Sequence, residues 1–354
     1  MPVLSVITPW HNTPIALFEE CARCVLHQSY TDFEWLIVDD GSDEESARFL
    51  DSFARTDPRI RVFHQEKSGV SFARNLALHH MTGAFFTFVD SDDTITRDFF
   101  SSALAALRST NVDIVYGLLR EIPSSVTLPH NGQQLVAGED LRKLVRCMIT
   151  GWDVPPMYNI GIHRPFAVAP RVYRASSFPD MRFDTGVFVG EDSLFNAITI
   201  SRASSVLFVQ EAWYNYISHD NSTVHTKRSA DDILHILSGF DRYSDVALEQ
   251  GWDASDIGVR FLRGILQPIY LFASYSSVRE ISSLITSILQ LRAARFIKDI
   301  DLSQYVVPTR LHALALRVSI ASLSRGLSVP LALTARIRHY VKDDTRLRRI
   351  IKRR

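Results

Sequence analysis

Three acidic residues lie within four positions directly after an apolar, β-type run at 86–89: Asp90, Asp92 and Asp93. Carboxylates this close repel one another, and a bound cation would offset that repulsion. Hard oxygen ligands on a short loop suit Mg²⁺ or Mn²⁺, and an ion held there would most naturally bind phosphate groups. The alternative interpretation is a solvated acidic turn before a helix that begins near Thr96.

A second acidic pair, Glu191 and Asp192, opens a predicted helix about a hundred residues later. A carboxylate beside a metal–diphosphate site can take a proton from an attacking hydroxyl, provided that it lies within hydrogen-bond reach. Acids in the first turn also favour the dipole of an ordinary helix. The chemistry of the pair alone leaves both interpretations open.

The first 116 residues alternate short β-branched runs with helical patterns, which predicts a mostly parallel sheet with crossover helices. We expect strands at 4–8, 34–38, 60–63, 84–89 and 112–116, and helices at 17–28, 44–54, 70–80 and 96–107. Polar residues follow four of these strands, at 9–12, 39–42, 65–69 and 90–93. Because ligands of open α/β sheets bind outside the carboxyl ends of the strands, the sequence predicts one site at this edge.

The composition narrows the function classes. The chain has 354 residues with 46% hydrophobic and 22% charged content, enough for one main domain and an appendage. Its formal net charge of zero gives no support for a nucleic-acid partner. Three cysteines make no disulfide framework and fit a reducing compartment. Cys21 and Cys24 form a C-x-x-C inside a helical pattern, which favours buried helix cysteines over zinc or redox chemistry.

The sequence predicts a cytoplasmic protein. The N-terminus runs into a strand without a basic signal-peptide region, and the weakly polar stretch at 264–278 is shorter than the roughly 20 residues of a spanning helix. From Tyr305 onward, basic side chains far outnumber the two acids, Asp343 and Asp344. This basic tail is either a solvated helix surface or a peripheral attachment to anionic lipid on the inner face of the cell membrane.

Five motifs taken together resemble family 2 of the inverting glycosyltransferases, which have the GT-A fold. They are VITPWHN (6–12), VDDGS (38–42), GVSFARN (69–75), FVDSDD (88–93) and GED (190–192). The set is specific in order and spacing over roughly residues 3–225, although each motif alone is weak. The resemblance implies a Rossmann-like, nucleotide-sugar-binding and catalytic domain at 1–228, followed by a helical C-terminal region with the basic tail at 229–354.

The resemblance also implies a donor site for a nucleotide-sugar, with a UDP-sugar expected. Pro9, Asp39 and Asp40 would line the nucleoside pocket, where an Asp accepts from the uracil ring or a ribose hydroxyl. Arg74 would lie by the base or the diphosphate. His11 stands where relatives commonly carry Tyr, and its imidazole can still stack on or bond to a base.

The same resemblance assigns the metal and the chemistry. Asp92 would hold Mn²⁺ or Mg²⁺ between the two phosphates, with Asp90 on the ribose or the metal and Asp93 supporting the loop or contacting the sugar. The metal acts as a Lewis acid on the leaving diphosphate. Asp192 would be the base that deprotonates an acceptor hydroxyl, with Glu191 orienting it or touching the acceptor. Attack from the face opposite the leaving group inverts the anomeric carbon.

A further ligand and the acceptor are less defined. His219 lies in a Ser/Asn-rich run and is either a metal or phosphate ligand or a solvated side chain. The commonest family role implies a saccharide or lipid-linked oligosaccharide acceptor in cell-surface polysaccharide synthesis.

Competing functions remain open from sequence. Residues 90–94 also fit D-x-D-x-T of haloacid-dehalogenase-type phosphatases, in which Asp90 would be the nucleophile, but that motif belongs after the first core strand. A sugar nucleotidyltransferase would need a Gly-rich, basic loop after the first strand, and residues 9–12 are neither. A non-catalytic partner subunit that binds a nucleotide-sugar is the non-enzymatic alternative.

Overall fold

The computed structural model describes residues 2–122, 132–150, 167–188, 190–217, 228–301, 303, 320 and 323. The chain forms two compact units. The first comprises Met1–Met148, Val154–Thr185 and Glu191–Asp220, and the second comprises Ile149–Asp153, Gly186–Gly190 and Asn221–Arg354. Short segments of the two units alternate along the chain. The single domain boundary between residues 228 and 229 stays a prediction.

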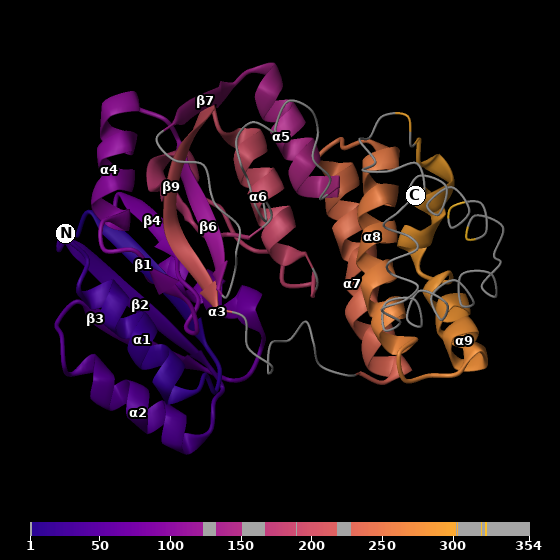
Figure 1. The fold of residues 1–354 in the computed structure, drawn as a ribbon, viewed down its shortest axis with the longest axis horizontal. Helices are drawn as coiled ribbons and strands as arrows, with labels where there is room; N and C mark the ends of the chain where they lie inside the picture. Colours follow the sequence, from indigo (N-terminus) through magenta and orange to yellow (C-terminus); the bar gives the residue numbers. More distant parts are fainter. Residues whose placement is uncertain are drawn as a thin grey trace, which may run out of the picture. The chain divides into compact units, whose positions relative to one another are not determined.

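The first unit begins with the predicted parallel sheet (Figure 1). Strands β1 (Leu4–Trp10), β2 (Phe33–Asp40), β3 (Ile60–Gln65) and β4 (Phe85–Phe88) lie in the order β3-β2-β1-β4. Helices α1 (Ile15–Leu26), α2 (Glu44–Ala54) and α3 (Val70–His80) connect them. The expected α/β fold class is confirmed, and the bounds of α2 and α3 are those predicted.

The sheet then continues as a mixed one. Strand β8 (Arg171–Arg174) lies antiparallel between β4 and β6 (Ile114–Ile122), and β9 (Ser205–Ile217) runs parallel to β6. Strands β5 (Thr94–Ile95) and β7 (Gln133–Ala137) pair antiparallel with β9. The helices of this half are α4 (Phe99–Thr110), α5 (Glu139–Thr150) and α6 (Glu191–Arg202). The sequence patterns predicted α4 and α6 but none of β5, β7, β8 and β9.

Aromatic side chains cover the two faces of the sheet. On one face, Phe18 of α1 packs on Trp10 and Trp35, with ring centroids 4.6 and 5.8 Å apart. On the other face, Phe195 of α6 packs edge-on against Phe88 at 5.7 Å. The register places these contacts on opposite faces, because Trp35 aligns with Val6 and Phe88 with Ile7, the next residue of β1. Helices α1 and α6 therefore pack on opposite faces of the sheet.

The described part of the second unit is helical, as expected for the region that begins at residue 229. It contains α7 (Ala230–Glu249), α8 (Ala254–Phe272), α9 (Val278–Ile288) and a 3₁₀ segment, Arg292–Asp299. Capping boxes start α7 at Ser229 and α9 at Ser277. Among the described residues, no helix is long and apolar enough to cross a membrane. His219 lies outside the described residues, and so does nearly all of the basic tail.

Candidate functional site

The loops after β1, β2 and β4 are joined to one another by hydrogen bonds. The Asn12 backbone N–H donates to Ser42 Oγ at 3.0 Å, and the Asp43 backbone N–H donates to Asn12 Oδ1 at 3.0 Å. Asn12 has φ +47°, a left-handed conformation that asparagine tolerates. The hydroxyls of Thr13 and Ser91 lie 2.6 Å apart. The convergence of strand ends that the sequence predicts is therefore present.

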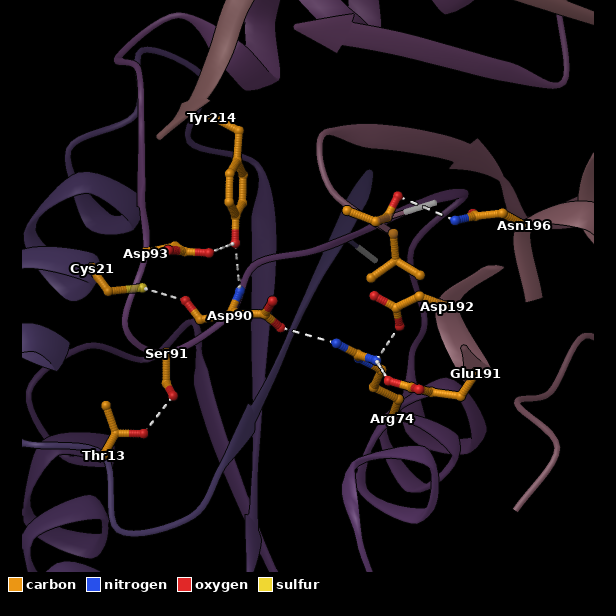
Figure 2. A network of polar contacts seen from close by, with 12 residues as sticks. Thr13, Cys21, Arg74, Asp90, Ser91, Asp93, Glu191, Asp192, Asn196 and Tyr214 are labelled. Atoms are coloured by element: carbon orange, nitrogen blue, oxygen red, sulfur yellow. Dashed lines mark hydrogen bonds and ion pairs between the residues drawn. The ribbon is translucent and has the colours of Figure 1, made fainter. Parts of the chain in front are cut away.

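The acidic loop after β4 is anchored from inside by Tyr214 of β9 (Figure 2). The Asp90 backbone N–H donates to the Tyr214 hydroxyl at 3.1 Å, and this hydroxyl donates to Asp93 Oδ2 at 2.7 Å. Asp93 Oδ1 accepts from the Ile217 backbone N–H at 2.8 Å. Asp93 is 2% exposed, and its burial, together with the charges of Asp90 and Asp92, raises its pKa well above the ordinary value. Asp93 therefore braces the loop that presents its two neighbouring acids.

Arg74 joins this loop to the second acidic motif (Figure 2). Its Nη2 donates to Asp90 Oδ1 at 3.1 Å, its Nη1 donates to Asp192 Oδ1 at 2.6 Å, and Glu191 Oε1 lies 3.8 Å from Nη1. The Arg74 side chain is only 4% exposed, and its guanidinium lies 5.2 Å from the centre of the Phe183 ring. Burial lowers the pKa of Arg74, but the three carboxylates raise it by more, so this group stays cationic.

Asp192 lies in the first turn of α6, where its side chain is partly exposed and its pKa is raised. Its side chain is 25% exposed. Burial raises its pKa and Asp90 adds to the rise, whereas Arg74 and the backbone N–H of Val168 act in the opposite sense; the net shift is upward. A carboxylate with a raised pKa is a stronger base than an ordinary aspartate, which suits proton removal from a hydroxyl.

The predicted nucleoside residues lie at the ends of β1 and β2. Asp39 Oδ1 accepts from the Ser42 backbone N–H at 3.0 Å, and Oδ2 lies 2.8 Å from His64 Nδ1. Pro9 lies beside this end of β2, because it aligns with Val38 in the register of the two strands. The exposed His11 places its Nε2 2.8 Å from Lys67 Nζ, and the ammonium donates to that nitrogen.

Asp40 faces a different set of partners from Asp39. Its Oδ1 accepts from Gln65 Nε2 and the Ser68 backbone N–H, both at 2.7 Å, and its Oδ2 accepts from the Gly69 backbone N–H at 2.8 Å. The residue is 5% exposed. Gly69 has φ +105°, a conformation that favours glycine. Asp40 thus fixes the turn that leads into α3 and Arg74, and its place in the nucleoside pocket stays a prediction.

Several structural partners were missed by sequence reasoning. Asn75 forms two hydrogen bonds with the Phe183 backbone, donating to its oxygen at 2.9 Å and accepting from its N–H at 2.8 Å. The only sequence feature that pointed to this contact was the amide side chain of Asn75, directly after Arg74. Tyr214, His64 and Lys67 carried no comparable sequence signal, because their partners come from distant strands and loops.

The described residues contain no cluster of three or more His, Cys, Asp or Glu side chains that could hold a metal by itself. Mg²⁺-type ions, however, are usually bound by one or two carboxylates together with substrate phosphates and water. Asp90 has a side chain 38% exposed, and Asp92 is partly exposed on the same loop. This donor set fits a divalent ion that is completed by a diphosphate.

Comparisons with known proteins agree with this geometry. Residues 5–163 match the model of glycosyl transferase family 2. Glycosyltransferase EpsJ of Bacillus subtilis is 30% identical over 230 residues, which cover 63% of each chain, and GlyG of Streptococcus pneumoniae is 26% identical over 273 residues, covering 73% of this chain and 85% of GlyG. This chain therefore spans less than two thirds of EpsJ.

The structure of S. aureus TarS 1-349 in complex with UDP-GlcNAc has a TM-score of 0.65 at 17% identity, with 97% of this chain and 93% of TarS covered. The likeness shows that the two proteins share their fold.

Proposed function

Because residues 5–163 match the model of glycosyl transferase family 2, we propose that this protein is an inverting, metal-dependent glycosyltransferase that uses a nucleotide-sugar donor. One observation carries the proposal. Arg74 links Asp90 of the acidic loop to Asp192, which lies 118 residues after Arg74 and beyond the matched range. Glycosyl transfer needs a metal ligand near the donor diphosphate and a general base near the acceptor hydroxyl. In this proposal Asp90 and Asp192 have these two roles, and Arg74 contacts both.

In this mechanism Asp192 accepts the proton of the acceptor hydroxyl while that oxygen attacks the anomeric carbon. Arg74 and the Val168 backbone N–H hold the Asp192 carboxylate in a fixed direction, and its remaining acceptor positions would receive the incoming hydroxyl. Glu191 lies on the same turn of α6 and orients the acceptor. Attack from the face opposite the leaving group inverts the anomeric configuration, and no covalent sugar–enzyme intermediate is needed.

Asp92 and Asp90 would hold Mn²⁺ or Mg²⁺, which supplies a Lewis acid for the departing diphosphate. Asp39, Pro9 and His11 would contact the nucleoside. A UDP-sugar is the proposed donor, supported by the carboxylates of Asp39 and Asp40, which suit the ring N–H of uracil, and by the UDP-GlcNAc complex of TarS. His219 stays a proposed further ligand.

The acceptor we propose is a saccharide or a lipid-linked oligosaccharide used for cell-surface polysaccharide. A cytoplasmic protein bound to the inner face of the membrane through its basic tail would reach a lipid-linked acceptor. Flotation with anionic liposomes tests this part: the full chain should float, and a chain ending at Gln304 should not. Equal behaviour of the two chains would contradict it.

The donor site is tested by thermal unfolding with UDP, GDP and CDP and their sugar conjugates, each with and without Mn²⁺. A ligand that binds only the folded state raises the melting temperature. We expect a Mn²⁺-dependent rise with uridine nucleotides for the wild type and none for Asp92→Asn. Asp98→Asn is the matched control, because Asp98 is exposed and its side chain forms no capping hydrogen bond to α4. If no nucleotide raises the melting temperature of the wild type, the proposed transferase function is refuted.

A further inference from the structure

The short segment Gly186–Gly190 leads directly into the first turn of α6, yet it belongs to the second unit together with α7 and α8. Helix α7 packs closely on this segment. A Cβ atom added to Gly239 of α7 would lie 2.8 Å from the Phe188 backbone nitrogen, too close for ordinary packing. The Phe188 ring stacks on His235 of α7, with ring centroids 5.2 Å apart. Helix α7 therefore holds the residues just before α6.

Arg260 of α8 lies against the last residue of the same segment. A Cβ atom added to Gly190 would overlap Arg260 Nη2 and lie 2.9 Å from Arg260 Cζ, so the guanidinium occupies the space that a side chain would take. Gly190 also has φ +85°, which favours glycine. Two rings of α7 hold the guanidinium, because its Cζ lies 5.7 Å from the ring centre of Phe240 and 5.6 Å from that of Tyr243.

A second arginine of α8 holds the chain at the end of α5. Arg263 lies three residues after Arg260, so the two side chains are neighbours on the helix surface. Arg263 Nη1 donates to the Thr150 backbone oxygen at 3.2 Å. Within the first unit, Ser193 Oγ in the first turn of α6 donates to the Met148 backbone oxygen near the end of α5. The start of α6 is thus bonded to the end of α5, which Arg263 contacts.

Asp192 therefore lies between two held positions: Gly190 before it packs on Arg260, and Ser193 after it is bonded to α5. We propose that Arg260 is a positioning residue for Asp192, which fixes the start of α6 and so gives the helical unit a part in catalysis. The inference rests on the proposed function, in which Asp192 takes the proton of the acceptor. Each contact that carries it lies within one unit, and the peptide bond after Gly190 joins the two units.

The start of α6 has to be fixed because of what Asp192 does there. A general base must lie within hydrogen-bond reach of the proton that it takes. Asp192 must meet this requirement while it keeps its 2.6 Å contact with Arg74. A residue in the first turn of a helix moves with the residue that starts the helix, and a misplacement of about 1 Å can cost about 100-fold in rate.

Two pairs of variants separate displacement of α6 from general destabilisation. Gly190→Ala places a methyl group in the space of the Arg260 guanidinium and keeps the arginine. Gly251→Ala is its matched control, because Gly251 has a similar φ of +72° and its added Cβ would meet none of the described residues within 4 Å. Arg260→Ala removes the guanidinium, and Arg295→Ala is its control, since the exposed Arg295 lies 4.7 Å over the Phe296 ring in the same unit.

The experiment measures the release of UDP from the UDP-sugar that most raises the melting temperature, with Mn²⁺ and with water as the acceptor. Water must also lose a proton to Asp192 but needs no acceptor subsite, so an arginine that only binds the acceptor would leave this rate unchanged. We expect the rate at saturating donor to fall about 10- to 100-fold in Gly190→Ala and in Arg260→Ala, with an unchanged dissociation constant for UDP. Both control variants should keep the wild-type rate.

A double variant tests whether Arg260 acts through the base. A residue that only positions Asp192 has no further effect once the carboxylate is gone, so Arg260→Ala should not lower the residual rate of Asp192→Asn. If the two substitutions lower the rate independently, Arg260 does not act through Asp192 and the inference is overturned.

The remaining outcomes separate the inference from the proposed function. If Asp192→Asn is impaired but Gly190→Ala loses no more rate than Gly251→Ala, the positioning role is refuted while the proposed function stands. If Arg260→Ala does not fold, this comparison of the two glycine variants decides alone. A wild type that releases UDP from no UDP-sugar overturns the inference together with the function on which it rests.

Discussion

Arg74 Nη1 donates to Asp192 Oδ1 at 2.6 Å, and the same guanidinium donates through Nη2 to Asp90 Oδ1 at 3.1 Å (Figure 2). One buried cation is thus shared between the acidic loop after β4 and the start of α6. Because planar guanidinium groups bind two carboxylates in fixed directions, Arg74 sets the orientation of Asp192 as well as its charge balance. The contact explains how an acid in the first turn of a helix becomes part of the site.

The first prediction concerns this orientation. Arg74→Lys keeps the charge but replaces the planar group by a single ammonium, which cannot reproduce both contacts. We expect kcat to fall about 100-fold, because small displacements of a reacting group have effects of this size, with little change in donor affinity. Steady-state kinetics with a measured UDP dissociation constant check this. Arg48→Lys, an exposed Arg paired with Glu44 on α2, is the control and should be neutral.

A second prediction addresses the base. Asp192→Asn keeps the shape of the side chain and removes its ability to accept a proton. We expect kcat to fall about 10³-fold, while UDP still raises the melting temperature as it does in the wild type. Transfer at the wild-type rate by this variant would show that another group takes the proton.

A third prediction follows from the pKa of Asp192, which burial raises above its ordinary value of 3.8. A general base acts only when it is ionised, so kcat/KM should fall as the pH drops through this raised pKa. The acid limb should therefore lie above pH 3.8. Arg74→Ala removes the cation that lowers this pKa, so its acid limb should shift to higher pH. If the wild type and Arg74→Ala have identical pH profiles, the acid limb does not report the ionisation of Asp192.

The sequence predicted the first half of the fold well, for a physical reason. Strands β1, β2 and β4 are short and largely apolar runs, and the helices between the strands have periodic apolar residues, so local patterns suffice. Strand β8 is only four residues long, with Arg171 and Arg174 among them, and it forms because β4 and β6 lie on either side of it. Such a strand depends on long-range pairing that no local pattern records.

The candidate site also has residues that local patterns predict and contacts that only long-range packing determines. The motifs located Asp90, Asp92, Glu191 and Asp192, because acids after a strand or at a helix start are visible in the sequence. They could not tell that Arg74 lies between two of these acids, since that contact depends on how α3 and α6 pack on the sheet. They also could not separate Asp39 from Asp40, whose adjacent side chains have different partners.

A fourth prediction distinguishes those two aspartates. Asp40→Asn places an amide N–H₂ where the backbone N–H groups of Ser68 and Gly69 need an acceptor. We expect a loss of about 1–3 kcal/mol in the free energy of unfolding, because at least one buried donor stays unsatisfied. Asp39→Asn should lose UDP affinity with a smaller change in stability. Urea unfolding and calorimetry on both variants check this, and equal effects on stability would contradict it.

The last prediction concerns the support of the acidic loop. Tyr214→Phe removes the hydroxyl that accepts from the Asp90 backbone N–H and donates to Asp93, while it keeps the packing of the ring. The loss leaves a backbone donor and a buried carboxylate without this partner, so we expect a decrease of about 1–3 kcal/mol in the free energy of unfolding. Because the hydroxyl positions the segment that carries Asp90 and Asp92, the Mn²⁺ concentration needed for half-maximal activity should also rise. Tyr30→Phe, whose partly exposed hydroxyl accepts from Arg108, serves as the control. A Tyr214→Phe protein with reduced stability but an unchanged Mn²⁺ requirement would limit Tyr214 to a purely structural role.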